Sequence, residues 1–497
     1  MANRDHALRL LQCLTVAIRP LRVEELAEIL AFDFEDAEGA TPKLNSDWRW
    51  DDRQRAVLST CSSLITLVDD GDSHVIQFSH FSVKEFLTSD RLAHSRGDIS
   101  HLHITDELAH TTLAQGCLGT LLQLDHGSSN NKVEASFPLA RYASRHWVEH
   151  AQFGVVSSQI EDGLRLLFDP ARPYFAAWLQ LHDIDDPLPG FGAFLTDEIA
   201  DRGSPLYYAS LCGFRDLAAH IVAEHPEQVN KRSGLNHSPL VAALHKRHFD
   251  VAELLHQHGA IVDLTSNRDR TPLQAASANG FIDVARWLLG HGANADLQDE
   301  KGWTPTIFAA ARGHLDIVRM LSGHGVRINA ATRQGWTPLR QVSYFGYVEI
   351  ARLLLQRGAD IGAKDEDYWT SLHLASSRGK VDVARLLLDH FADIEAENKV
   401  GMTSLHLASF SGEAEVVRLL LGRGANGKAE DNDGSTPLHL ASSEGKPETV
   451  RLLLDHGANA DAKDKEGTTP FQLASERERN EIVLMLTEHR AQADRKP

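Results

Sequence analysis

The sequence of 497 residues has room for two to four domains, and its 42 % hydrophobic and 24 % charged residues are ordinary for soluble globular proteins. The net charge of −19 argues against a general affinity for nucleic acid or anionic lipid, because both repel an acidic surface. The four cysteines form no CxxC pair, and neither a membrane-spanning apolar run nor a secretory leader is present, so we expect a cytoplasmic protein.

The first hundred residues predict three helices followed by a hairpin. The helices are expected at residues 7–14, 23–30 and about 55–64, and the two strands at 64–68 and 75–78. Asp69-Asp70-Gly71-Asp72 between the two strands is a strong hairpin signal. A polar, acidic loop is expected between residues 33 and 52. This order of elements predicts a winged-helix domain over residues 1–100.

Several short motifs in this region resemble one family. They are Gln12-Cys13-Leu14, Arg19-Pro20-Leu21, Cys61-Ser62-Ser63-Leu64-Ile65 and Gln77-Phe78-Ser79-His80-Phe81-Ser82-Val83-Lys84-Glu85-Phe86-Leu87. With them, residues 7–181 resemble the winged-helix and helical region that follows the NACHT nucleotide-binding domain in fungal NLR-like (STAND) proteins. In that family an NTPase module precedes this region and ankyrin repeats follow it. The resemblance implies that the winged helix is a hinge between modules and not a DNA-binding domain.

Residues 101–202 predict a helical spacer that supports the C-terminal part of the chain. Helical patterns cover residues 108–122, 139–150, 159–168 and 174–181. The stretch from 185 to 203 contains Pro187-Leu188-Pro189-Gly190, which is typical of a domain boundary.

From residue 203 onward one motif recurs at a fixed period. Starts similar to [Thr/Ser]-[Pro/Ser]-Leu stand at Ser204, Ser238, Thr271, Thr304, Thr337, Thr370, Thr403, Thr436 and Thr469. The first step is 34 residues and every later step is 33. This looks like the ankyrin repeat, whose signature T-P-L-H-x-A recurs every 33 residues. We therefore predict a mostly α fold, with an ankyrin-repeat solenoid of about nine repeats (203–490) preceded by the winged helix and the helical spacer.

Each part of the repeat has a local role. The Thr or Ser hydroxyl caps the first helix, and Pro suits its first turn, where no N–H is needed. A Gly then ends the helix in the left-handed conformation. In the ninth repeat Glu478 and Arg490 replace both usual glycines, and in the second repeat we place His248 at the helix-stop position. Because degraded end repeats are typical of polar caps, we expect residues 203–497 to fold alone.

The sequence carries no recognisable nucleotide or catalytic motif. A P-loop needs G-x-x-x-x-G-K-[ST], whereas the Gly-Lys pairs at 379–380, 427–428 and 445–446 are followed by neither Ser nor Thr. We therefore expect no nucleotide binding and no NTPase module in this chain. No catalytic residues, cofactor or nucleic-acid partner are predicted, so we expect a protein that is not an enzyme.

Histidines are frequent but do not predict a metal site. His101 and His103, with His94 and His110 nearby, lack the cysteine or carboxylate spacing of metal ligands, and we interpret them as solvated or structural. The histidines of the T-P-L-H motif are predicted to form hydrogen bonds between adjacent repeats. They are His373, His406 and His439.

Aromatic and arginine residues predict where a partner binds. The residue before the capping Thr is Trp303, Trp336 and Trp369 in three successive repeats, and stacking would align the indoles in a ridge on the concave surface. The ends of the first helices add Arg312, Tyr344, Phe345 and Arg378. Trp, Tyr and Arg are enriched at interface hot spots, so we predict a protein ligand centred on repeats four to six. The alternative is that each indole only packs on its own hairpin. Met402, at the same position in repeat seven, is expected to lie outside the ridge.

Two functions fit this organisation. The first is a protein-interaction scaffold, the ligand-recognition half of an NLR-like (NACHT/STAND) signalling or innate-immunity protein that lacks its NTPase module. The alternative is an ankyrin substrate adaptor that presents a bound protein to a separate enzyme, such as a ubiquitin ligase. The predicted winged helix favours the first function.

Overall fold

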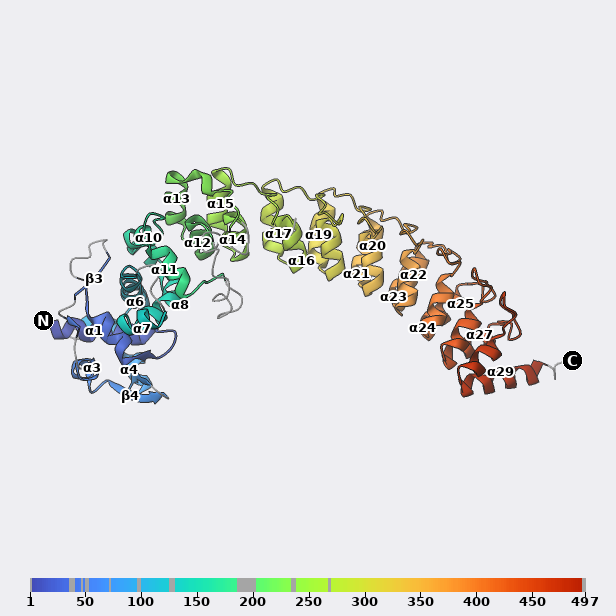
Figure 1. Cartoon of the computed structure of the whole chain (residues 1–497), viewed down its shortest axis with the longest axis horizontal. Helices are drawn as coiled ribbons and strands as arrows, with labels where there is room; N and C mark the ends of the chain where they lie inside the picture. Colours follow the sequence, from blue (N-terminus) through green and yellow to red (C-terminus); the bar gives the residue numbers. More distant parts are fainter. Residues whose placement is uncertain are drawn as a thin grey trace. The chain divides into compact units, whose positions relative to one another are not determined.

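The computed structural model describes residues 2–34, 41–45, 48–49, 53–70, 73–95, 100–124, 130–185, 203–233, 238–266 and 270–493. The chain forms two compact units, Met1–Ile261 and Val262–Pro497, and both are mostly helical (Figure 1). The centre of the predicted hairpin turn (71–72) and most of the predicted boundary segment (186–202) lie outside the described residues.

The N-terminal unit begins with a winged helix. Its helices are α1 (Ala2–Val16), α2 (Val23–Leu30) and α3 (Arg53–Cys61), and its wing is the hairpin of β4 (Ile65–Asp70) and β5 (Ser73–Phe78). The short strand β1 (Leu21–Arg22) pairs antiparallel with β5, so the sheet has the order β1-β5-β4. The predicted winged helix is confirmed.

Short elements around this core differ from the prediction. Part of the loop expected at 33–52 is a two-stranded ladder of β2 (Phe32–Asp33) and β3 (Lys43–Leu44). Strands of two residues are too short to show an alternating pattern, which is why neither this pair nor β1 was predictable. After the wing, α4 (Phe81–Leu87) and α5 (Asp90–Ala93) begin at capping side chains of His80 and Ser89. A single 3-10 turn, Ser100–Leu102, follows.

The helical region packs directly on the winged helix. It consists of α6 (Asp106–Leu121), α7 (Asn130–Ser136), α8 (Ala140–Ala151), α9 (Val156–Gln159), α10 (Glu161–Leu167) and α11 (Tyr174–Leu181). Helix α6 packs against both α1 and α8. Gly119 of α6 leaves room for the Phe32 ring of β2, because a Cβ there would lie 2.7 Å from that ring. The helix predicted at 159–168 is instead broken at Ile160, whose φ and ψ of −112° and 18° are not helical.

The first two repeats belong to the same compact unit. Their helices are α12 (Pro205–Cys212), α13 (Arg215–Glu224), α14 (Pro239–His245) and α15 (Phe249–Gln257), with a 3-10 turn at Pro226–Gln228. Tyr208 is fully buried, and its ring lies 5.5 Å from Phe175 and 5.9 Å from Trp178 of α11. The first repeat is therefore covered by the helical region and is not the polar cap that the sequence suggested.

The second unit contains the third to ninth repeats, each built from two helices (Figure 1). The pairs are α16 (Pro272–Asn279) and α17 (Ile282–Gly290), α18 (Pro305–Arg312) and α19 (Leu315–Gly323), α20 (Pro338–Phe345) and α21 (Val348–Gln356), α22 (Ser371–Ser377) and α23 (Val381–Asp389), α24 (Ser404–Ser411) and α25 (Ala414–Gly422), α26 (Pro437–Ser443) and α27 (Pro447–Asp455), and α28 (Pro470–Glu476) and α29 (Asn480–Ala493). Each first helix packs on the first helix of the next repeat. The predicted ankyrin-repeat solenoid is confirmed in this unit.

The residue that ends the first helix of the second repeat differs from the prediction. The stop in the second repeat is Arg247 (φ 64°), not His248. The His248 ring instead lies over Gly213 of the first repeat, where a Cβ would meet it at 2.5 Å. Counting nine residues from the capping Ser238 gives Arg247, the spacing that also separates Ser204 from Gly213. In the ninth repeat Glu478 does occupy the left-handed stop, with φ of 57°.

Two aromatic residues also adopt the left-handed conformation. Tyr368 (φ 61°) and Phe391 (φ 65°) stand where equivalent positions of other repeats carry Gly, and they are 53 % and 92 % exposed. Bulky residues at positive φ are uncommon and strained, and such strain concentrates at functional sites. Both lie within the fifth and sixth repeats.

Candidate functional site

Short turns present the side chains of the site. In the turn 365–369, Asp365 Oδ1 accepts hydrogen bonds from the N–H groups of Asp367 (3.0 Å) and Trp369 (2.8 Å), and the Trp369 carbonyl accepts one from the Asp365 N–H. An Asp or Asn makes the same turn at 299–303, 398–402, 431–435 and 464–468, and Thr332 replaces it at 332–336. We call these five-residue turns fingers. Each finger places its last residue directly before the capping Thr of a first helix.

A groove with a volume of about 830 Å³ is lined by residues of three fingers and three first helices. Its finger side is formed by Gln334, Asp365, Glu366 and Asp367. Its helix side is formed by Tyr344, Leu374, Ser377, Arg378, Leu407, Phe410 and Ser411, with Trp336, Trp369 and Met402 between the two sides. Aromatic and apolar side chains thus line the centre, while three carboxylates stand on one side.

The groove brings together four of the seven predicted binding residues, namely Trp336, Tyr344, Trp369 and Arg378. Trp303, Arg312 and Phe345 do not line it. Each of the three indoles contacts the first helix that follows it: Trp303 lies 4.9 Å from Phe308, Trp336 lies 5.8 Å from Tyr344, and Trp369 lies 6.1 Å from His373. Local packing and a place in the groove therefore coexist for Trp336 and Trp369.

Met402 lies inside the groove, where the sequence placed it outside the binding surface. It contributes together with Leu407 and Phe410 of the seventh repeat, and Phe410 is 47 % exposed. The groove is therefore centred on repeats five to seven, one repeat later than the predicted ridge. The exposed aromatic at the end of a first helix was the available signal, since Tyr344 stands two repeats earlier at the same position.

Arg340 is the most unusual residue beside the groove. It occupies the position of the T-P-L-H histidine, its side chain is completely buried, and it donates to the Gly335 carbonyl and to Asp365 Oδ2. Its guanidinium also lies 5.0 Å from the centroid of the Trp336 ring. Burial lowers the pKa of Arg340, and the hydrogen bond to Asp365 opposes that effect. The pair fixes Asp365 and Trp336 relative to each other.

Arg378 is held in a different way. Its guanidinium lies 4.3 Å from the centroid of the Tyr344 ring and donates a hydrogen bond to the Tyr344 hydroxyl. This contact joins the first helices of the fifth and sixth repeats. A cation–π contact that also satisfies a donor restrains an otherwise flexible side chain, so the helix side of the groove is pre-organised.

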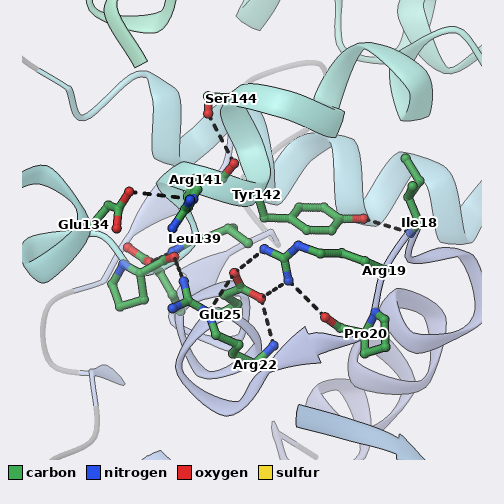
Figure 2. Close-up of polar contacts among 12 residues, drawn as sticks. Ile18, Arg19, Pro20, Arg22, Glu25, Glu134, Leu139, Arg141, Tyr142 and Ser144 are labelled. Atoms are coloured by element: carbon green, nitrogen blue, oxygen red, sulfur yellow. Dashed lines mark hydrogen bonds and ion pairs between the residues drawn. The ribbon is translucent and has the colours of Figure 1, made fainter. Parts of the chain in front are cut away.

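A second polar cluster joins the winged helix to the helical region (Figure 2). The completely buried Glu25 carboxylate accepts hydrogen bonds from Arg19 (2.6 and 2.9 Å), from the Arg22 N–H (2.8 Å) and from Arg22 Nε (3.1 Å). The bond to Glu25 raises the pKa of Arg19. Arg19 also lies 5.0 Å from the centroid of the Tyr142 ring, and the Tyr142 hydroxyl accepts a bond from the Ile18 N–H. The Arg19-Pro20-Leu21 motif thus locks the turn between α1 and α2 against α8.

This cluster continues into a pair of histidines, His110 and His150. His150 bonds to the Tyr142 hydroxyl (2.8 Å) and to His110 (2.8 Å). Burial lowers the pKa of His150 to about 3, so its ring is neutral at pH 7 and serves as a structural link. His101 contacts Arg4, and His94 lies 2.8 Å from the Asp90 carbonyl.

The cysteines are buried in the structure. All four cysteines are free and buried, and burial raises the pKa of the Cys13 and Cys61 thiols to about 12 and about 11. In the part of the chain that the structure describes, no three His, Cys, Asp or Glu side chains gather where a metal ion could sit. Among the same residues, no helix combines the length and the hydropathy needed to cross a bilayer.

Comparisons with known proteins agree with both modules. A family model for ankyrin repeats (3 copies) matches residues 206–299, 275–365, 357–431 and 423–496. A model for the winged helix domain of GPI inositol-deacylase matches residues 1–97. Azaphilone pigments biosynthesis cluster protein L from Monascus ruber is 31 % identical over 273 residues, which cover 50 % of this chain and 54 % of that protein. The chain therefore spans about half the length of this curated relative.

Proposed function

The chain belongs to the ankyrin-repeat family, and on this premise we propose that it is an interaction scaffold that binds a protein partner in the groove of repeats five to seven. The single observation behind the proposal is the composition of that groove. It combines two indoles, a phenol stacked with an arginine, and an exposed phenylalanine within about 830 Å³. Buried aromatic and arginine anchors carry most of the free energy of protein–protein binding.

The groove is also rigid. Asp365 is tied to the finger backbone and to Arg340, and Arg378 is tied to Tyr344. A pre-organised surface loses little conformational entropy when a partner binds, so more of the contact energy appears as affinity. No residue of the groove is a nucleophile activated by a base, and we propose a binding role without catalysis.

The winged helix supports a finer proposal, that the chain is the recognition part of an NLR-like (NACHT/STAND) signalling system. In this proposal the N-terminal unit transmits partner binding to an NTPase module. The Arg19–Glu25 pair suits such a role because Arg19 also lies over the Tyr142 ring of α8 and so holds the winged helix against the helical region. The coding sequence upstream of Met1 tests this part: a continuous reading frame with a P-loop would support it, and a stop codon with no P-loop partner would contradict it.

The binding proposal can be tested with the full chain and a library of short random peptides. A peptide selected by the wild-type chain is synthesised, and its affinity is measured by fluorescence anisotropy. Replacing Trp336 by Ala should weaken binding by about 2 kcal/mol, or about thirtyfold, which is typical of an aromatic hot spot.

The matched control is Trp303→Ala. Trp303 has the same position in its finger but packs on Phe308 outside the groove, so its loss should leave the affinity unchanged. Unchanged affinity of Trp336→Ala together with a lower melting temperature would mean that Trp336 only packs locally, and the proposed binding site would be wrong.

A further inference from the structure

Near the groove, two hydrogen bonds that recur in the other repeats are replaced or missing. In repeats six to eight the T-P-L-H histidine donates a hydrogen bond to the carbonyl of the next finger, at 3.1–3.2 Å. Arg340 replaces this histidine in repeat five and turns instead to Gly335 and Asp365. Adjacent fingers are joined by a backbone N–H···O bond at Arg333–Lys301, Lys399–Asp367, Asn432–Val400 and Lys465–Asp433, but the equivalent bond between Glu366 and Gln334 is not formed. Glu366 and Gln334 both line the groove.

The charges that face the groove are mainly negative. The Asp365 carboxylate forms an ion pair with Arg340 and accepts a hydrogen bond from the backbone of its own finger, whereas the Glu366 and Asp367 side chains are exposed. Asp367 has a cation within reach, Lys399 at 3.7 Å, but both side chains are largely exposed and such a pair contributes little. Arg378 is the cation that lines the groove, and its guanidinium is already stacked on Tyr344.

We propose that the occupant of the groove is a protein segment in which a lysine or arginine stands beside an apolar side chain. This inference rests on the proposed function and adds the chemistry of the partner. The cation would pair with Glu366 and Asp367, and the apolar side chain would lie among Trp369, Met402 and Phe410. A guanidinium or ammonium also gains from the indole faces next to the carboxylates, since cations bind above aromatic rings.

Peptide sets measured on the full chain test this chemistry. The probes are random short peptides with one central position fixed as Arg, Lys, Gln or Glu and a Leu fixed nearby. The Arg and Lys sets should bind at least about tenfold more tightly than the Glu set, and the difference should shrink as salt is added. Equal affinity of the four sets would overturn the proposal.

A charge-removing variant and a matched control locate the effect. Glu366→Gln with Asp367→Asn should abolish the preference for Arg and Lys. The control is Glu300→Gln with Asp433→Asn, which removes two carboxylates from equivalent finger positions outside the groove and should retain the preference. The melting temperatures of both variants should equal that of the wild type, which shows that a change in preference does not come from unfolding.

The outcomes separate this inference from the function on which it rests. If Trp336→Ala abolishes binding while the preference for basic peptides is absent or survives Glu366→Gln/Asp367→Asn, the groove binds a partner of other chemistry and the inference is wrong. If Trp336→Ala binds the selected peptide as tightly as the wild type, the proposed function fails and the inference fails with it.

Discussion

The three buried histidines of the T-P-L-H motif make the stability of the array depend on pH. In each one, Nδ1 accepts a hydrogen bond from the backbone N–H of the capping threonine, and Nε2 lies 3.1–3.2 Å from the carbonyl that ends the next finger. A second proton would place an N–H at Nδ1 against that backbone N–H. Burial accordingly lowers the pKa of all three rings, and that of His373 to about 4.

The direction of the effect follows from the proton balance. Above about pH 7 the histidines are neutral in both the folded and the unfolded chain, and their contribution to stability is complete. Below the ordinary pKa of about 6.5, His373 binds a proton in the unfolded chain but stays neutral in the folded chain. The free energy of unfolding therefore falls as the pH is lowered, until the pH reaches about 4. At about pH 5, protonation of His373 in the unfolded chain should lower the free energy of unfolding by about 2 kcal/mol, because this pH lies about 1.5 units below the ordinary pKa and still above the pKa in the folded chain.

Replacing His373 by Gln removes the titration and keeps the bonds. The third repeat already carries Gln274 at this position, where Oε1 accepts from the Thr271 N–H (2.8 Å) and Nε2 donates to the Trp303 carbonyl (3.0 Å). We therefore expect His373→Gln to match the wild type at about pH 7.5 and to be about 2 kcal/mol more stable at about pH 5.

Urea unfolding followed by circular dichroism at the two pH values measures this difference. The same loss of stability in wild type and His373→Gln between the two pH values would show that His373 is protonated without cost in the folded chain, and the reasoning would be refuted.

Three further predictions concern the fold. Phe391→Gly should raise the free energy of unfolding by about 1 kcal/mol by relieving a left-handed phenylalanine, and Gly424→Ala at the equivalent position (φ 89°) should lower it by about the same amount; urea titration tests both signs. Glu25→Gln should lower the free energy of unfolding by about 2 kcal/mol in the same assay, less than for a fully buried pair because Arg19 and Arg22 are partly exposed and can turn to water. The fragment 203–497 should aggregate in light scattering while the full chain stays monodisperse, because the cut exposes the ring of Tyr208; a monodisperse fragment would contradict this.

The repeat was predictable because its signals are local. A threonine cap, a proline in the first turn and a left-handed glycine act within one helix, and they recur every 33 residues. The same holds for α2 and α11, whose bounds Val23–Leu30 and Tyr174–Leu181 agree with the hydrophobic pattern. The second repeat lacks the glycine, but the nine-residue spacing from the capping Ser238 still identifies Arg247 as its helix stop, so His248 was a wrong assignment of a predictable position.

The features that escaped prediction depend on partners distant in sequence. Strand β1 exists because Leu21 pairs with Ile76, and the burial of Tyr208 comes from rings contributed by α11. The groove likewise combines residues up to 77 positions apart, from Gln334 to Ser411. Arg340 was visible as a departure from the T-P-L-H motif, but its contact with Asp365 could be known only from the structure.

The most direct test of the binding site is hydrogen–deuterium exchange of the full chain with and without a selected peptide. The proposed function predicts that the bound peptide slows exchange in the segments of the chain 334–344, 365–378 and 402–411, which contain the residues that line the groove. Exchange at the fourth repeat, including Trp303 and Arg312, should be unchanged. Protection confined to segments outside the groove, with residues 334–411 exchanging as in the free chain, would contradict the proposed site.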